Sequence, residues 1–543
     1  MEDQRPPAAR SGHLPALRVP RQRWPRHVTG QCRELTCCAK SREIATKIAA
    51  FRTFPLNFLP LCHLPQCRSP EASRAARTGL RRHFCALVGS GPSGNACCTA
   101  AKAAGRTLSV LASLPDELDC SIALRSMPRL KVLVSAYACE PHKGSEAEIG
   151  WNWARQAARY HDVWVITRAS NRAAIEAQVA LGQLTNVSWV YYDLPRWLRG
   201  WKRQRRGLYV YYLIWQSAVY WIARSLHQTH RFDLVHHVTF GTYWLPTFLG
   251  RLGLPFIWGP VGGGESGPAS FRSTLSLRGR SVEQLRSVVR WCAERTPLLR
   301  AVARSVDLAF ATTEESAAAL RRMGASRVRV LSHVALPRED RVRLARLPLR
   351  NERPFRIVSI GHLIAWKGLH LSLAAFARLV AAVPDCEYWI VGDGPERLRL
   401  ERLASRLGVP GNVRFVGSVP RTTVMQILSA CDVLVHPSLH DSGGYACVEA
   451  MACGRPVVCL DLGGPAALVD SECGIRIPAN NPEQTKREIA AALRALAEDP
   501  AHRARLGAGA RRVVAARCDW DKVGDFVYGD YAYSLARPGS DAA

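Results

Sequence analysis

The chain has 543 residues, of which 48% are hydrophobic and 22% charged, and its formal net charge is +30. This length has room for two or three domains with their own cores, and no apolar run reaches the roughly 20 residues that a membrane span needs. The positive charge favours an anionic partner, but the arginines are spread along the chain without a zinc-finger, RNP or helix-turn-helix signature. We therefore predict a protein that meets a membrane surface or a phosphate-bearing substrate, and no nucleic acid.

The eighteen cysteines divide equally about Met127. Those that follow it are scattered, mostly within apolar segments, as expected for small buried side chains in a reducing compartment. None has the paired CxxC spacing of a zinc site. The cysteine pattern thus predicts a cytoplasmic chain without a bound metal.

Residues 1–126 are rich in Arg, Pro and Cys and lack sustained helical or strand periodicity, which predicts a poorly structured extension. Met127 stands shortly before the strand pattern KVLVSAY at 131–137. Our hypothesis is that the biological start is Met127 and that the preceding sequence is a mis-assigned extension. The alternative is a disordered or targeting tail, which a basic composition also permits.

The stretch 127–350 alternates strand and helix patterns, as an N-terminal parallel-sheet domain would. Its strand patterns are KVLVSAY, DVWVIT, VSWVYYD, DLVHHV, PFIWG, DLAFAT and VRVLS. Gly144 and Ser145 form a turn between the first strand and the first helix, where backbone N–H groups and the helix dipole can hold an anion. This loop is a candidate acceptor or diphosphate site.

Two further candidates follow later strands of the same stretch. His236 and His237 end the fourth pattern, at the edge where parallel sheets bind ligands. Because side chains alternate along a strand, one of the two is expected to face the cleft; the alternative for each is a hydrogen-bonded, partly buried imidazole. Gly262 and Gly263 let the backbone approach a substrate closely, although a merely flexible loop is an equal alternative.

The segment WLRGWKRQRR at 197–206 precedes an aromatic stretch at 208–223. Basic residues beside Trp and Tyr suit a helix that rests on an anionic bilayer. The alternative is an amphipathic helix packed on the sheet with a solvated basic face. The two interpretations agree if only the end near 197–201 meets lipid.

The stretch 351–510 predicts a second parallel sheet, because four apolar runs that end in turns alternate with helical patterns. The runs are FRIVSIG, EYWIVGDGP, DVLVHPSLH and PVVCLDLGGP. The candidate residues at their carboxyl ends are Gly361, His362, Lys367, Asp441, Ser442, Gly443, Gly444 and Glu449. Alone, Lys367 could be a solvated surface lysine, and Asp441 and Glu449 a loop acid and a helix cap. Their joint occurrence at successive strand ends favours a site for a diphosphate with sugars on either side.

Together these patterns resemble the retaining GT-B glycosyltransferases of family 4 over most of 127–535. The motifs that carry the resemblance are Gly361-x5-Lys367-Gly368, Val391-Gly392-Asp393-Gly394-Pro395, Phe415-Val416-Gly417, His436-Pro437-Ser438, Glu449-Ala450-Met451-Ala452-x-Gly454-x-Pro456 and Gly463-Gly464-Pro465. In the first half, Gly144-Ser145-Glu146 and Gly259-Pro260-x-Gly262-Gly263 look like a branch associated with bacterial surface polysaccharides.

The resemblance implies an α/β protein of the GT-B type, with two Rossmann-like parallel-sheet domains facing across a cleft. It implies transfer of a sugar, with retention, from a nucleoside diphosphate sugar to a hydroxyl of a lipid-linked or oligosaccharide acceptor. The nucleotide sugar is a co-substrate, and the resemblance implies no other cofactor and no metal. Such a chain would be cytoplasmic, peripheral at the inner face of the membrane.

The resemblance also assigns roles. Asp441 and Glu449 have the seven-residue separation of the family's acidic pair; Asp441 would bind hydroxyls of the donor sugar and Glu449 the nucleotide ribose. Amides of Gly443 and Gly444 would meet the diphosphate, and Lys367 would neutralise the charge that grows on it as the glycosidic bond breaks. His237, or His236, corresponds approximately to a family histidine near the reacting sugar.

Two positions depart from the family pattern. His362 stands where the family usually has Arg, and Asp441 where it usually has Glu. An imidazole can donate to a phosphate but is not reliably charged at neutral pH. These departures keep open a catalytically silent nucleotide-sugar-binding protein. A nucleotide-sugar epimerase of the GT-B type, which shares the two-domain architecture, is the other alternative. The last segment, 511–543, is predicted to form a helix that crosses back to the first domain, followed by a tail.

Overall fold

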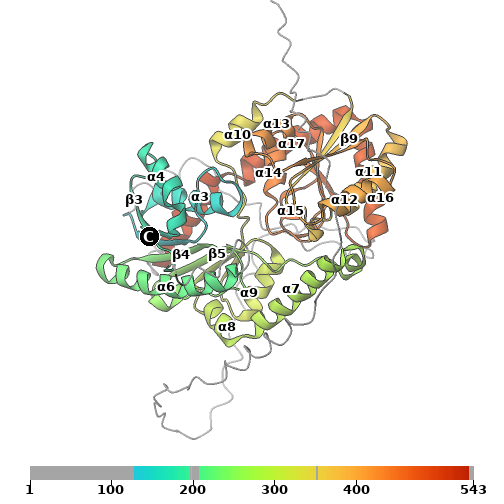
Figure 1. Ribbon diagram of the computed structural model, residues 1–543. Helices are drawn as coiled ribbons and strands as arrows, with labels where there is room; N and C mark the ends of the chain where they lie inside the picture. The colour runs from blue at the N-terminus through green and yellow to red at the C-terminus, as the bar shows by residue number, and fades with distance from the viewer. Residues whose placement is uncertain (1–127, 196, 198–206, 350–352, 537–543) are drawn as a thin grey trace, which may run out of the picture. The chain divides into compact units, whose positions relative to one another are not determined.

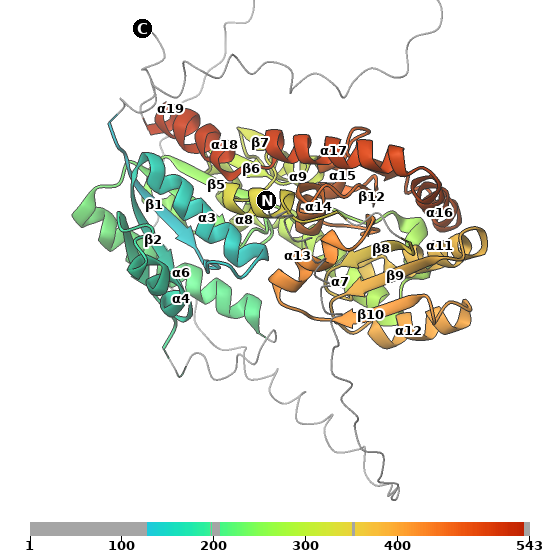
Figure 2. The same cartoon turned by 90° about the horizontal axis from the view of Figure 1, so that it is seen from above.

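The computed structural model describes residues 128–195, 197, 207–349 and 353–536, which form two parallel sheets with helices on their faces (Figures 1 and 2). The predicted α/β architecture with two parallel sheets is confirmed. The hypothesis about residues 1–126 and the basic part of the predicted bilayer segment, 198–206, lie outside the described residues. Trp197, at the start of that segment, is 77% exposed.

The first sheet has seven strands in the order β3-β2-β1-β4-β5-β6-β7. Their bounds are β1 Lys131–Ala136, β2 Asp162–Thr167, β3 Val187–Tyr191, β4 Leu234–Thr239, β5 Phe256–Val261, β6 Leu308–Ala311 and β7 Val328–Val330. The helices between and after them are α3 Ser145–Tyr160, η3 Ala169–Asn171, α4 Arg172–Ala180, α6 Leu208–His230, η4 Leu249–Leu252, η5 Ala269–Thr274, α7 Leu277–Arg295, α8 Pro297–Arg304, α9 Glu314–Met323 and α10 Arg338–Ala345.

The second sheet has six strands in the order β10-β9-β8-β11-β12-β13. Their bounds are β8 Phe355–Ile360, β9 Cys386–Val391, β10 Val413–Gly417, β11 Val433–His436, β12 Val457–Leu460 and β13 Gly474–Ile477. Its helices are η6 Ala365–Lys367, α11 Leu369–Ala382, α12 Arg397–Arg406, α13 Arg421–Ser429, α14 Tyr445–Ala452, α15 Gly463–Leu468, α16 Pro482–Glu498 and α17 Pro500–Arg517. The last elements are α18 Trp520–Gly524, the π-helical turn η7 Asp525–Tyr531, and α19 Ala532–Ala536.

Both faces of the first sheet are buried, which explains why its strands read as nearly continuous apolar runs. One face packs against α6, α8 and α9, with Tyr212 and Trp215 at its centre. The other packs against α3 and the end of the chain, through Trp153, Trp520 and Tyr528. The predicted aromatic stretch 208–223 is thus part of α6, a helix whose buried side is core. Among the described residues, no helix has the length and apolar character needed to cross a bilayer.

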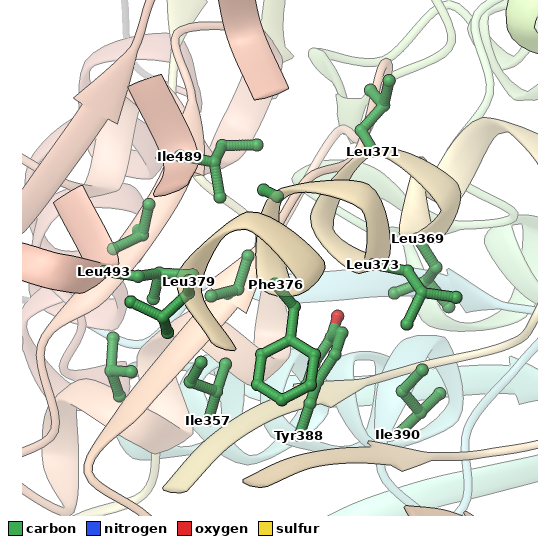
Figure 3. Close-up of a cluster of buried hydrophobic side chains, with 14 of the residues drawn as sticks. Ile357, Leu369, Leu371, Leu373, Phe376, Leu379, Tyr388, Ile390, Ile489 and Leu493 are labelled. Carbon is green, nitrogen blue, oxygen red and sulfur yellow. The ribbon is translucent and has the colours of Figure 1, made fainter. Parts of the chain in front are cut away.

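The second sheet is covered by α11 and α16 on one face and by α14 and α17 on the other. Figure 3 shows Phe376 and Leu379 directed from α11 toward Tyr388 and Ile357 on the strands. Helix α16 begins where the Asn481 side chain accepts a hydrogen bond from the Gln484 N–H at 2.9 Å, an N-cap that supplies one of the helix's missing acceptors.

Two sets of described contacts join the sheets. The connection after β5 places Phe271 and Leu275 in the same buried cluster as the side chains of α11. After α17, the Leu336 N–H donates to the Cys518 carbonyl at 3.0 Å. Trp520 then packs edge-to-face on Trp153 of α3, with 5.3 Å between the ring centroids. The chain therefore leaves the second sheet after α17 and finishes on the first.

Buried histidines make the stability of this fold depend on pH. Burial lowers the pKa of His161 and of His236 to about 4, and each ring hydrogen-bonds to Tyr528 of the returning segment. Both take up a proton in the unfolded chain below about pH 6.5 but stay neutral in the fold down to about pH 4. The unfolded state then binds more protons, so the free energy of unfolding falls as pH drops through this window.

We expect the free energy of unfolding to fall by about 2 kcal/mol between pH 7 and pH 5 because of His236 alone. Urea denaturation at the two pH values measures it, and a His236→Asn variant should have a shallower pH dependence than the parent chain, whatever its stability at pH 7. An unchanged pH dependence would show that the ring is not held neutral by burial.

Candidate functional site

Lys367 and Asp441 meet at the carboxyl edge of the second sheet. Lys367 ends η6, the turn after β8, and Asp441 lies in the loop between β11 and α14. Gly368 follows with a φ of 66°, and a Cβ there would lie 1.9 Å from the Pro437 carbonyl oxygen, so only glycine lets the turn pack against the β11 loop. This packing brings the Lys367 ammonium into an ion pair with Asp441 Oδ2.

The same carboxylate oxygen accepts a second hydrogen bond, from His436 Nε2 at 3.0 Å. Burial alone would raise the pKa of Asp441, but the Lys367 charge and the His436 hydrogen bond outweigh it and hold that pKa well below its usual range. Burial also lowers the pKa of His436, against the pull of Asp441. The site therefore presents a fixed anion and a fixed cation side by side.

A hollow opens beside this pair. Its lining includes Gly361, His362, Lys367 and His436, so the structure brings together three predicted residues and one that was not predicted. The exposed His362 donates from Nδ1 to the Asp393 carbonyl at 2.5 Å, which fixes the ring at the edge of the hollow. A phosphate in the hollow would face one charged side chain, Lys367, and two imidazoles.

Gly443 and Gly444 lead into α14, as expected for an anion-binding helix start. The Gly443 N–H donates to Asp441 Oδ1 at 3.3 Å, and no side chain caps the helix at Gly444. The first amides of a helix lack partners inside it and carry the positive end of its dipole. Gly443 and Gly444 lie two and three positions after Asp441, so this helix start is at the same edge as Lys367.

Ser442 connects this edge to the first sheet. A Cβ on Gly262 would lie 2.6 Å from the Ser442 Cβ. The absence of a side chain at Gly262 therefore lets the loop after β5 approach the loop that contains Ser442. The next residue, Gly263, donates its N–H to Glu265 Oε2 at 3.0 Å. The predicted Gly262–Gly263 loop thus lies against the predicted Ser442–Gly444 loop.

Glu449, the second predicted acid, lies within a separate cluster. Its Oε1 accepts from Arg421 Nε at 2.9 Å, while Arg421 also pairs with Glu148 of α3 at 2.9 Å and with Asp340 of α10 at 3.0 Å. Tyr445 accepts a further hydrogen bond from the same guanidinium at 3.2 Å. One partly buried arginine therefore holds three carboxylates that come from three helices.

This cluster sets three carboxylates against a single guanidinium, so each acid does not have a cation of its own within it. Burial raises the pKa of Glu449, and the Arg421 charge opposes that rise. Burial would lower the pKa of Arg421, but the surrounding acids and Tyr445 hold it above its usual value. The Arg421 charge thus limits the rise in the pKa of Glu449.

Gly144 and Ser145 stand at the start of α3, and Glu148, the partner of Arg421, follows in the first turn of the same helix. The predicted first-sheet loop is therefore within one helical turn of a residue that contacts the second sheet. Glu146, between them, accepts the Gly241 N–H at 2.8 Å.

The expectation that His236 or His237 faces the cleft is corrected by their positions. His236 Nδ1 and Nε2 hydrogen-bond to Tyr528 Oη at 2.7 Å and to the Gly259 carbonyl at 2.8 Å. His237 bonds Tyr212 Oη at 3.0 Å and Ser135 Oγ at 3.2 Å on the opposite face. The side chains do alternate, but helices cover both faces of a central parallel strand, so alternation sends each ring into a buried layer.

Sequence reasoning missed Arg421, Glu148, Asp340 and the contact of His436. A signal existed for Arg421, because it follows the Pro420 turn that leaves β10 at the same edge as the other candidates. Glu148 carries no such signal, since its partner lies 273 positions further along the chain. Within the described part of the chain, no group of three or more metal-ligating side chains could hold a metal ion.

Each half of the chain matches a known protein family. Residues 343–513 match the family described as glycosyl transferases group 1, and residues 143–333 match the glycosyl transferase 4-like domain. Together the two matches cover more than half of the chain.

Curated relatives match parts of the chain. A lipopolysaccharide core biosynthesis glycosyltransferase of Rhizobium meliloti is 35% identical over 173 residues, which is 30% of this chain and 45% of the relative. A D-inositol 3-phosphate glycosyltransferase of Streptomyces bingchenggensis is 38% identical over 138 residues, 25% of this chain and 29% of the relative. The matched stretches span less than half of either relative.

Among solved structures, the chain is similar to one from E. coli described as trehalose-6-phosphate bound with UDP-2-fluoro glucose. The TM-score is 0.53 at 16% identity, over 75% of this chain and 99% of that one. At this identity the likeness concerns the fold.

Proposed function

The chain belongs to the group 1 glycosyl transferases and has the GT-B fold, and from this premise we propose that it transfers a sugar, with retention, from a nucleoside diphosphate sugar to a hydroxyl of a lipid-linked or oligosaccharide acceptor. The observation that carries the proposal is the Lys367–Asp441 pair beside the Gly443–Gly444 helix start. A cation, an anion and the amides of a helix start at one sheet edge suit a ligand that is itself part diphosphate and part sugar.

Each group has a separate task in this proposal. Lys367 and the α14 amides face the diphosphate, whose negative charge grows as the glycosidic bond breaks, and positive groups fixed in place stabilise that charge without reorganising. Asp441 is held ionised, so it accepts hydrogen bonds from sugar hydroxyls at any pH near neutrality. Lys367 and these amides supply the positive charge, and the proposed reaction uses no metal or further cofactor.

Glu449 would accept the ribose hydroxyls, and Arg421 fixes its carboxylate for that purpose. Because Glu449 is buried, an unopposed rise in its pKa would protonate part of it and weaken its acceptance of two hydroxyl hydrogens. The Arg421 charge opposes this rise, so the proposed ribose contact depends on a residue that also pairs with Glu148 and Asp340.

The acceptor and the setting are proposed from the relatives. A relative in lipopolysaccharide core biosynthesis supports an acceptor in surface polysaccharide assembly. The Gly262 loop of the first sheet lies against Ser442 at the proposed donor edge, and Gly144–Ser145 precede Glu148, which pairs with Arg421. Both loops are proposed to meet the acceptor. The proposed setting is the cytoplasm, at the inner face of the membrane.

Thermal unfolding in the presence of a panel of UDP- and GDP-sugars tests the donor site. We expect one nucleotide class to raise the transition temperature, since a ligand at a hundred times its Kd adds about 2.7 kcal/mol to the stability of the fold. UDP-sugars come first, because the E. coli structure of the same fold holds one.

The matched ligand controls are the corresponding nucleoside monophosphates and free sugars. They lack the diphosphate that faces Lys367 and should shift the transition much less. A panel in which no nucleoside diphosphate sugar stabilises the chain, or in which monophosphates do so equally well, would contradict a diphosphate site.

A further inference from the structure

Helix α7 turns Arg286 and Arg290 toward the protein, while its large apolar side chains are exposed to solvent. The exposed side chains include Leu277 at 79%, Leu285 at 65% and Trp291 at 58%, and Val282, Val288 and Val289 are exposed as well. A surface helix ordinarily shows the opposite arrangement, with its apolar stripe toward the core. These six side chains, which we call the apolar stripe of α7, are left uncovered by the described structure, and the exposed Ser281, Gln284 and Ser287 lie among them.

Contacts on the inner face of α7 explain why the helix is oriented with its large apolar side chains outward. Arg286 donates to the Glu265 and Gly263 carbonyls at 2.7 and 3.1 Å, and Arg290 donates to the Glu265 carbonyl at 3.1 Å. These carbonyls belong to the glycine-rich loop after β5, which lacks side chains to satisfy them. Arg286 and Arg290 are thus committed to this loop, and the large apolar residues of α7 are left outside.

The charges that flank the apolar stripe are all positive. Arg278, Arg280 and Arg295 are exposed, and the Arg295 guanidinium lies 4.2 Å from the centre of the Trp291 ring. The two acids of α7 turn inward, where Glu283 pairs with His440 and Glu294 accepts from Tyr243. An apolar stripe with cationic edges and an interfacial Trp fits an anionic lipid surface.

Other occupants fit this charge pattern less well. Two copies of the chain meeting on this face would bring the same arginines together, and like charges repel. Residues 1–127 are themselves basic. We propose that the outer face of α7 docks on an anionic membrane, at a place in the chain different from the 197–206 segment that the sequence indicated.

The docking surface extends the proposed function, because a lipid-linked acceptor lies in a bilayer. Vesicle binding is measured without donor or acceptor, so failure of docking and failure of transfer are read separately. The full chain is sedimented with vesicles of phosphatidylcholine and phosphatidylglycerol and with phosphatidylcholine alone. We expect binding to the anionic vesicles only, weakening as salt screens the charges.

Two variants test the face itself. Arg278→Gln with Arg295→Gln should lower the vesicle partition by about fivefold per arginine, and Leu285→Ser with Val288→Ser should lower it by about tenfold. The matched control is Leu398→Ser with Arg402→Gln on α12, where Leu398 is also exposed; it should bind like the parent chain. Circular dichroism checks that each variant is folded.

The reactivity of Cys292, which is exposed within the α7 helix, reports what covers it. Peptide mass spectrometry after maleimide treatment should show Cys292 labelled in the free chain and protected by anionic vesicles. The proposal is overturned if the parent chain does not bind these vesicles or if the α7 variants bind as it does. It is also overturned if Cys292 is already protected in the free chain. Protection at every protein concentration would mean that residues of the same chain cover α7, and protection only at high concentration would mean that a second copy does.

Discussion

Replacing Lys367 with alanine is expected to lower kcat for sugar transfer by about 10²–10³-fold, the usual cost of removing one positive donor from a developing anion. The Lys367 ammonium is the positively charged side chain that faces the proposed diphosphate. It pairs with Asp441 at the edge of the second sheet. Binding of the donor should weaken much less, because the α14 amides remain. Initial rates across donor concentrations separate kcat from KM.

The Lys367→Ala variant also removes the charge that holds the pKa of Asp441 down, so its folding must be checked by thermal unfolding. Lys522→Ala removes an exposed lysine on α18 and serves as the matched control with unchanged rates. Full activity of folded Lys367→Ala would show that the diphosphate does not rest on this lysine.

Replacing Arg421 with alanine is expected to destabilise the fold by about 3–5 kcal/mol, because a buried charge that loses its partner is costly. Glu148, Glu449 and Asp340 would all lose the same cation, and their side chains are between 4% and 21% exposed. Two of the three come from outside the second sheet and its helices, so the variant should also loosen the contact between α3 and α13. Urea denaturation at pH 7 measures the loss.

The matched control is Arg378→Ala, which breaks a single exposed ion pair with Glu483 and should cost about 1 kcal/mol or less. Arg421→Lys keeps the charge but cannot direct a planar fork of donors at three carboxylates, so it should lie between the two. If Arg421→Ala unfolds no earlier than Arg378→Ala, the arginine is not what holds the cluster.

The fold and one half of the site follow from local patterns in the sequence. Strands that end in turns at Gly361 and before Asp441 place these residues at one edge, since parallel strands share their carboxyl edge. The Lys367–Asp441 contact needs no more than this rule and the glycine at position 368.

The rest depends on packing that no local pattern records. Glu449 has the expected spacing from Asp441, but its partner Arg421 is fixed by α3 and α10, which come from distant parts of the chain. The two histidines of β4 alternate as predicted, and only the helices above and below the strand make both of them buried. Similarly, the orientation of α7 follows from the carbonyls of the loop it covers.

The central claim is that this edge turns over a nucleoside diphosphate sugar, and release of nucleoside diphosphate from the stabilising donor, with and without oligosaccharide acceptors, tests it most directly. We predict measurable turnover that acceptor accelerates and that Lys367→Ala reduces by about 10²–10³-fold. Tight binding of a donor with no release across the whole panel would contradict this claim and identify a silent nucleotide-sugar-binding protein.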